Sequence, residues 1–173
     1  MRKRLAGIVA ALAMGIVPVA AVQAPALASG HVCTAFGLKW CLDANSLAAG
    51  TAIVNGSGRD IIVQNQHHTS GGLEVYRLVF ALDTTKCVGL SANGLAEVRD
   101  CSGGDSSFVN WQNDKTGNGT TFWFNTRYPA GDCATSGDQG DFLTSDNVSG
   151  HRVFCSGDVK SGDEAQWTPS PLQ

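Results

Sequence analysis

The stretch Thr85-Lys86-Cys87-Val88-Gly89-Leu90 has a counterpart at the same distance on either side of it along the chain. Upstream lies Lys39-Trp40-Cys41-Leu42-Asp43-Ala44, and downstream lies Gly131-Asp132-Cys133-Ala134-Thr135-Ser136. The interval from Cys41 to Cys87 and the interval from Cys87 to Cys133 are both 46 residues. A recurrence at a fixed period of about 20 to 50 residues is typical of a repeated structural unit, and three units are about the minimum that buries a shared core. The sequence therefore predicts three repeats.

More than the cysteines recurs. Val63-Gln64-Asn65 follows the first of these cysteines and Trp111-Gln112-Asn113 follows the second, and each is succeeded by a Gly-containing turn and an apolar run. Near the end of the chain, Trp167 holds the place of Trp111. We expect units near residues 33–84, 85–130 and 131–173.

The N-terminus reads as a secretory signal peptide. Arg2-Lys3-Arg4 precede an apolar segment from Leu5 to Val22, and Ala26-Leu27-Ala28 offers small residues at the cleavage spacing. A membrane anchor is the alternative, but Pro18 and the cleavage site argue against it. We therefore expect residues 1–28 to be removed and residues 29–173 to form a single exported domain.

Charge argues against two classes of partner. Removing the basic residues of the leader makes the formal net charge more negative than the −3 of the whole chain. Binding to nucleic acid or to an anionic membrane rests on clustered Lys and Arg. Neither nucleic-acid binding nor membrane insertion is expected.

The chain has six cysteines, and an even number in an exported protein indicates disulfides. Sequence alone allows about 15 pairings. The repeats favour Cys87–Cys101 and Cys133–Cys155 within one unit each, which leaves Cys33–Cys41. A zinc site is the alternative, but there is no Cys-x-x-Cys pair and we expect the histidines to lie away from the cysteines. No metal and no cofactor are predicted.

The mature chain reads as strands and turns, with no convincing helix. The candidate strands are short, rich in β-branched or aromatic residues, and separated by Gly, Asn, Asp and Ser. They are Ile61 to Val63, Glu74 to Leu82, Leu95 to Val98, Thr121 to Asn125, Phe142 to Ser145 and Arg152 to Phe154. An all-β domain follows.

Three β units, each with a Cys-bearing first strand and a later Trp, resemble the ricin B-type β-trefoil lectins. The resemblance rests on Cys41-Leu42-Asp43-Ala44 and the following Ala49-Gly50-Thr51, and it extends over residues 39–168. It implies a β-trefoil with pseudo-threefold repeats, in which the unit Trp enters the core. The sequence departs from the family at the position two residues before each Trp, where Val109 and Ala165 replace the usual Gln, and Val63 replaces the first Trp.

A sugar site needs a carboxylate to accept hydroxyl hydrogen bonds and amides that both donate and accept. Asp43 is the acidic residue at its place in the units, because its counterparts are Gly89 and Thr135. Gln64 and Asn65 are the candidate amides. Each residue also has a structural interpretation: Asp43 could bond backbone N–H groups in a turn, and the amides could satisfy the backbone at unit junctions.

No catalytic motif is present in the sequence, such as Gly-x-Ser-x-Gly or His-Glu-x-x-His. The prediction is a secreted lectin-like module that binds a glycan, with no enzymatic activity. The alternative is a trefoil that binds another secreted protein, for example as a protease inhibitor, because a fold does not fix a function.

Overall fold

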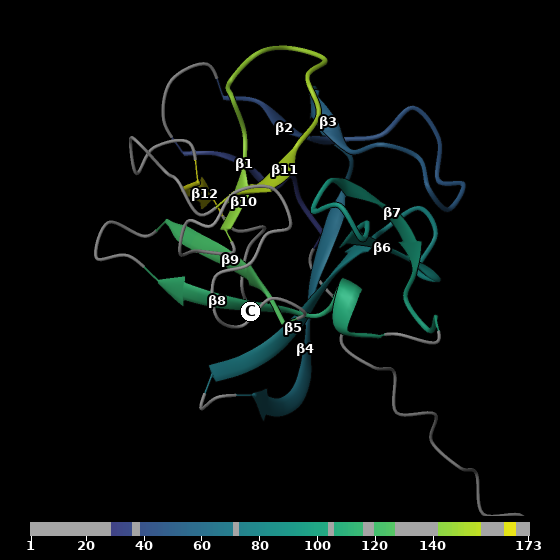
Figure 1. Cartoon of the computed structure of the whole chain (residues 1–173), viewed down its shortest axis with the longest axis vertical. Helices are drawn as coiled ribbons and strands as arrows, with labels where there is room; N and C mark the ends of the chain where they lie inside the picture. The colour runs from purple at the N-terminus through teal and green to yellow at the C-terminus, as the bar shows by residue number, and fades with distance from the viewer. Residues whose placement is uncertain are drawn as a thin grey trace, which may run out of the picture.

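The computed structural model describes residues 29–35, 39–70, 73–103, 106–115, 120–126, 142–156 and 165–168. In chain order, the elements are β1 (Cys33–Thr34), β2 (Cys41–Asp43), β3 (Val54–Gly56), β4 (Ile61–Ser70), β5 (Leu73–Phe80), β6 (Lys86–Leu90), β7 (Ala96–Asp100), η1 (Ser106–Val109), β8 (Trp111–Lys115), β9 (Thr121–Asn125), β10 (Phe142–Thr144), β11 (Phe154–Ser156) and β12 (Trp167–Thr168) (Figure 1). Among these residues, no helix is long and apolar enough to cross a membrane.

The all-β prediction is confirmed, and each of the six candidate segments contributes to a strand or a bridge. β7 shows why these sequences extend: Ala96 and Val98 are buried while Glu97 and Arg99, which alternate with them, are not. Side chains alternate between the two faces of a strand, so this pattern buries one face and leaves the other for polar contacts.

Three backbone hydrogen bonds reveal the threefold arrangement directly. The Ile53 N–H donates to the Ala96 carbonyl at 3.0 Å, the Ala96 N–H to the Val153 carbonyl at 3.0 Å, and the Val153 N–H to the Ile53 carbonyl at 2.9 Å. A closed ring of this kind places the three residues at equivalent positions around a common axis. All three are fully buried.

Each repeat has four strands: the third strands are β4, β8 and β12, and the fourth strands are β5, β9 and β1. Each third strand pairs with the fourth strand of its own repeat and with the fourth strand of the preceding repeat. The pairs are Ile61 with Phe80 and Gly30, Trp111 with Asn125 and Tyr76, and Trp167 with Thr34 and Thr121. The core placement of Trp111 and Trp167 is confirmed, because neither exposes any surface.

This register corrects one predicted equivalence. Ile61, and not Val63, occupies the place of Trp111 and Trp167, and Ile61 is fully buried while Val63 is only partly so. The predicted equivalence of Val63 and Trp111 rested on the Gln-Asn pair that follows each of them in the sequence. An aliphatic side chain fills the core position in the first repeat and leaves no aromatic signature.

The third repeat needs a similar correction. The Trp111 indole donates to the Val88 carbonyl at 2.9 Å, and the Trp167 indole donates to the Leu143 carbonyl at 2.7 Å. Leu143 on β10 is therefore the equivalent of Val88, and Phe142 stands where Cys87 stands in the second repeat. The equal cysteine spacing marks first strands in the first two repeats only. Cys133 lies outside the described residues.

The N-terminal strand closes the structure. β1 pairs with β12 through Cys33↔Thr168 and Thr34↔Trp167, so it serves as the fourth strand of the third repeat although it comes first in the chain. The predicted first unit, residues 33–84, includes this strand. Its other neighbour is β2, where Cys33 faces Cys41.

Two predicted disulfides are confirmed, Cys33–Cys41 and Cys87–Cys101. The first joins the third repeat to the first, so its derivation from one pair per unit was wrong even though the pair is right. Cys155 is also disulfide-bonded. Its predicted partner, Cys133, lies outside the described residues.

Candidate functional site

Asp43 ends β2, and its carboxylate is held by the hairpin that follows. Oδ1 accepts a hydrogen bond from the Ala44 N–H at 2.8 Å, and Oδ2 accepts bonds from the Ser57 hydroxyl at 3.2 Å and the Gly58 N–H at 3.4 Å. Arg59 Nε lies 3.3 Å from Oδ1. The structure thus gives Asp43 the turn-stabilising role, and a direct contact with a sugar stays a prediction.

These contacts set the charge state of Asp43. Burial alone would raise the pKa of its carboxyl, and it is the largest single influence. The hydrogen bonds from Ala44, Ser57 and Gly58 and the Arg59 charge together outweigh burial, so the pKa lies below its ordinary value of 3.8. Asp43 is therefore a carboxylate at neutral pH.

The Arg59 guanidinium is held by the Ala44 carbonyl and by the Asp43 carboxylate. Its Nε and Nη2 donate to the Ala44 carbonyl at 3.0 and 2.6 Å, next to the contact with Asp43. Two bonds from one planar guanidinium to the same region restrict its rotation. Asp43 consequently positions Arg59 at the rim of the first repeat.

Beside Arg59 lies a pocket of about 370 Å³. Its lining combines polar and apolar side chains: His31, Leu47, Arg59, Asp60, Phe80 and Leu82. The Asp60 side chain is 62% exposed, and Leu82 is 81% exposed. A volume of this size falls within the ~300–1,000 Å³ typical of small-molecule sites.

The predicted amides lie elsewhere. Gln64 and Asn65 are on β4, where they pair with Arg77 and Tyr76 of β5. The Asn65 side chain donates to Glu74 at 3.1 Å. Figure 1 shows the β4–β5 hairpin at the opposite end of the molecule from β2. The structure does not bring Gln64 and Asn65 together with Asp43.

The second repeat has no open counterpart to Asp43. Gly89 holds this place, and a Cβ there would lie 2.7 Å from Arg99 Cδ. The Arg99 guanidinium lies 4.6 Å from the centre of the Phe108 ring and donates to the Leu90 carbonyl at 2.7 Å. The protein's own side chains therefore fill the position.

In the third repeat the equivalent of Asp43 is Thr144, which follows Leu143. The predicted counterpart, Thr135, lies outside the described residues. Thr144 is buried, and its hydroxyl donates to the Phe142 carbonyl at 2.9 Å. Among the described residues, only the first repeat keeps a carboxylate at this place.

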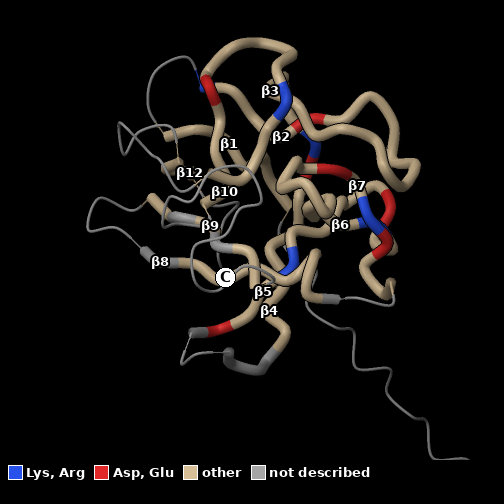
Figure 2. The backbone as a smooth tube through the Cα atoms, in the orientation of Figure 1, with Lys and Arg blue, Asp and Glu red and all other residues tan. Residues whose placement is uncertain are grey.

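Charged residues of opposite sign lie close to one another (Figure 2). Besides the Arg59–Asp43 pair, Arg99 contacts Glu97 at 3.2 Å, and Lys86 forms an ion pair with Asp100. Both of these pairs involve β7 and are only partly shielded from solvent, so each contributes little to stability.

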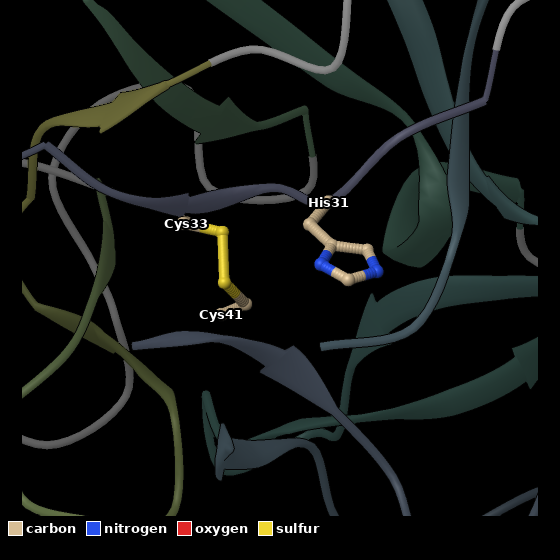
Figure 3. A group of neighbouring side chains, drawn as sticks. All are labelled: His31, Cys33 and Cys41. Atoms are coloured by element: carbon tan, nitrogen blue, oxygen red, sulfur yellow. A yellow bond between two sulfur atoms is a disulfide. The ribbon is translucent and has the colours of Figure 1, made fainter. Parts of the chain in front are cut away.

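One group of side chains was missed in the sequence. His31, Cys33 and Cys41 each place a potential metal-ligating atom within 4.8 Å of the other two (Figure 3). The expectation that the histidines lie away from the cysteines is therefore wrong for His31. The available signal was the spacing His-x-Cys, which puts both side chains on the same face of a strand.

No protein-family model matches the sequence, and no curated protein is detectably similar to it. Solved structures do match. The protein is similar to a mosquitocidal holotoxin, with a TM-score of 0.65 and 10% identity over 86% of this chain, and it spans 18% of that toxin chain. It is also similar to ThreeFoil, a designed 3-fold symmetric protein, with a TM-score of 0.59 and 19% identity over 82% of this chain and 98% of that one.

The fold is a β-trefoil. A third similar structure is the cytolethal distending toxin from Actinobacillus actinomycetemcomitans, with a TM-score of 0.53 and 17% identity over 82% of this chain and 93% of the matched chain. These identities establish a shared β-trefoil fold, and the fold expected from the ricin B-type resemblance is thereby confirmed.

Proposed function

We propose that the protein is a secreted carbohydrate-binding module without catalytic activity, and that the sugar binds in the pocket of the first repeat. The observation that carries this proposal is the meeting of Asp60, Arg59 and His31 with the apolar Leu47 and Leu82 around one opening. Two of the structurally similar proteins are toxins, which fits a trefoil used for recognition.

The chemistry of this lining suits a sugar. The exposed Asp60 carboxylate can accept bonds from two neighbouring hydroxyl groups, while the Arg59 guanidinium can donate to ring or hydroxyl oxygens. Leu82 offers an apolar surface for a C–H face. In this arrangement Asp43 is a positioning residue, because it holds Arg59. Direct sugar contacts by Asp43, Gln64 and Asn65 remain predictions from the sequence.

Secretion is supported by the disulfides, which form and persist in oxidising compartments. Binding without catalysis is part of this proposal. The Asp43 carboxylate is engaged by its hairpin and by Arg59, and none of its contacts among the described residues is a second acid. The signal peptide over residues 1–28 lies outside the described residues and remains part of this proposal.

A glycan array probed with the parent protein and with Asp60→Asn tests the proposal. The parent is expected to bind a defined set of glycans, and the variant to bind them about ten- to 100-fold more weakly, because a charge-assisted hydrogen bond contributes about 1.5–3 kcal/mol. Asp100→Asn is the matched control, because Asp100 is 54% exposed on β7 and lines a different pocket.

The competing function is binding of a secreted protein. Leu82, which is 81% exposed on the turn after β5, is the apolar side chain against which such a partner would pack. A parent protein that binds no glycan would contradict the proposal. If the parent protein then bound a secreted protein and Leu82→Ser abolished that binding, the alternative would be established.

A further inference from the structure

The group formed by His31, Cys33 and Cys41 lies where the N-terminal strand β1 meets β2. Cys33 and Cys41 face each other directly across this antiparallel pair. His31 precedes Cys33 by two residues, so both side chains project from the same side of the chain. Figure 3 shows the imidazole ring turned toward the disulfide, with one nitrogen on the side of the sulfurs.

We propose that reduction of Cys33–Cys41 converts this group into a binding site for a soft divalent cation such as Zn²⁺. Two thiolates and an imidazole are a ligand set typical of zinc, and a site with three protein ligands keeps a fourth position open for water. The inference does not depend on the proposed glycan binding.

The backbone keeps the ligands together without the disulfide. The Leu42 N–H donates to the Val32 carbonyl at 2.9 Å, and the Thr34 N–H donates to the Trp40 carbonyl at 2.8 Å. These two bonds flank the cysteine pair on either side and maintain its register. After reduction the two sulfurs therefore stay on neighbouring strands, where zinc–sulfur bonds of about 2.3 Å can span them with only side-chain rotation.

The third ligand is held in place as well. His31 Nε2 lies 3.4 Å from Asp60 Oδ1, which leaves Nδ1 as the nitrogen for the metal. A carboxylate on the far nitrogen of a ligating histidine fixes its tautomer and ring orientation. Gly58 packs closely against both side chains: a Cβ at this position would lie 2.7 Å from Cys41 Cβ and 3.1 Å from His31 Nδ1. Asp60 is thus a positioning residue.

A dithiol or a phosphine can reduce the Cys33–Cys41 disulfide. A dithiol passes two electrons and two protons to the disulfide, yields two thiols, and leaves as its own disulfide. With a phosphine, water supplies the oxygen of the phosphine oxide and both thiol protons. The cation then displaces the two thiol protons, so binding strengthens as pH rises. In the oxidised form the sulfurs are bonded to each other and cannot act as thiolate ligands.

Zinc content provides the first test. The purified protein is reduced with a phosphine under anaerobic conditions, incubated with Zn²⁺, desalted and analysed for bound metal. We expect about one bound zinc per chain in the reduced protein and none at this site in the oxidised protein. The double variant Cys33→Ser/Cys41→Ser, which keeps the other cysteines, should lose this zinc, and His31→Ala should weaken binding at least about tenfold. His151→Ala is the control, because His151 is an exposed histidine paired with Asp146 in another turn.

Cobalt provides a second readout that a folding defect cannot imitate. Co²⁺ in the reduced protein should give thiolate-to-cobalt charge-transfer absorption, and Asp60→Asn should weaken cobalt binding without removing that absorption. Equal zinc binding by the oxidised protein would overturn the proposal. Unchanged binding by His31→Ala, or no metal bound by the reduced parent that retains its β-sheet circular dichroism, would overturn it equally.

Discussion

At the scale of single residues, Asp43 shows how one carboxylate is committed to structure. It binds the backbone of its own hairpin and orients Arg59, so its contribution depends on its charge. The folded-state pKa lies below the ordinary 3.8. The stabilisation is therefore complete at pH values above about 4 and is lost as the pH falls through the folded-state pKa.

The variant Asp43→Asn is expected to be less stable than the parent by about 1 kcal/mol near pH 6, because an amide cannot accept the same set of hydrogen bonds. Urea unfolding measured at several pH values checks this. The difference between the two proteins should shrink as the pH falls below 4. Asp60→Asn, at an exposed carboxylate, should show no comparable loss, and a pH-independent difference for Asp43→Asn would contradict the account.

Tyr76 offers a second residue-scale prediction. Burial, together with its hydrogen bond to Glu74 and the charge of that carboxylate, raises the pKa of the Tyr76 hydroxyl to about 12, against a smaller opposing effect of Asn113. Ultraviolet titration of the folded protein should show one tyrosine ionising near pH 12. In Tyr76→Phe this step should disappear. Because the raised pKa favours the neutral form, the stabilisation is lost progressively as the pH rises from about 10 to about 12. The chain has a second tyrosine, Tyr128, so the Tyr76 step is the difference between the titrations of the parent and of Tyr76→Phe. A midpoint near pH 10 in that difference would contradict the raised pKa.

At the scale of elements, the strands were predictable and their partners were only partly so. β-branched and aromatic runs such as Thr121 to Asn125 extend because they fit a half-buried pleated surface. β1 is only two residues long and gains its place from β12, which lies at the other end of the chain. Local sequence has no information about that partner.

The equivalence of the repeats and the make-up of the site also depend on tertiary contacts that local sequence does not specify. Cys41 and Cys87 share a structural position, but Phe142 fills it in the third repeat, where a cysteine motif gives no guidance. The prediction grouped Asp43 with Gln64 and Asn65 because sugar sites combine these residue types. The pocket instead draws His31 and Leu82 from segments that carry no motif, and only the tertiary fold brings them beside Arg59.

The disulfides give a prediction at this scale. Cys33–Cys41 closes a segment with a sequence separation of 8 residues and Cys87–Cys101 one of 14. In the chain-entropy model each bond contributes about 2–3 kcal/mol, slightly more for the longer segment. Replacing either pair by serines should lower stability by about that amount in thermal unfolding. Cys33–Cys41 joins β1 to β2, and β1 pairs in turn with β12. Loss of this bond should therefore also increase amide hydrogen exchange in β1 and β12, whereas loss of Cys87–Cys101 should leave these two strands protected.

At the scale of the whole molecule, the pseudo-threefold scaffold is used unequally. The core is shared by all repeats through Ile53, Ala96 and Val153, while the rim differs from one repeat to the next. At the position equivalent to Asp43, the second repeat is filled by Arg99, which packs over Phe108. The third repeat has the buried Thr144 at this position. The first repeat keeps charged groups beside an open pocket. On the proposed function, we therefore expect the sugar to bind at the first repeat among the described parts of the chain.

The most direct test is an amide NMR titration with an oligosaccharide selected on the glycan array. We expect saturable shifts of the backbone resonances of Arg59, Asp60 and Leu82, with a stoichiometry of about one sugar per chain. Resonances of Gln64 and Asn65, which lie in the middle of β4 and do not line the pocket, should remain unchanged. Shifts confined to Gln64, Asn65 and their partners Tyr76 and Arg77, or an array without any bound glycan, would contradict the claim that the first-repeat pocket binds carbohydrate.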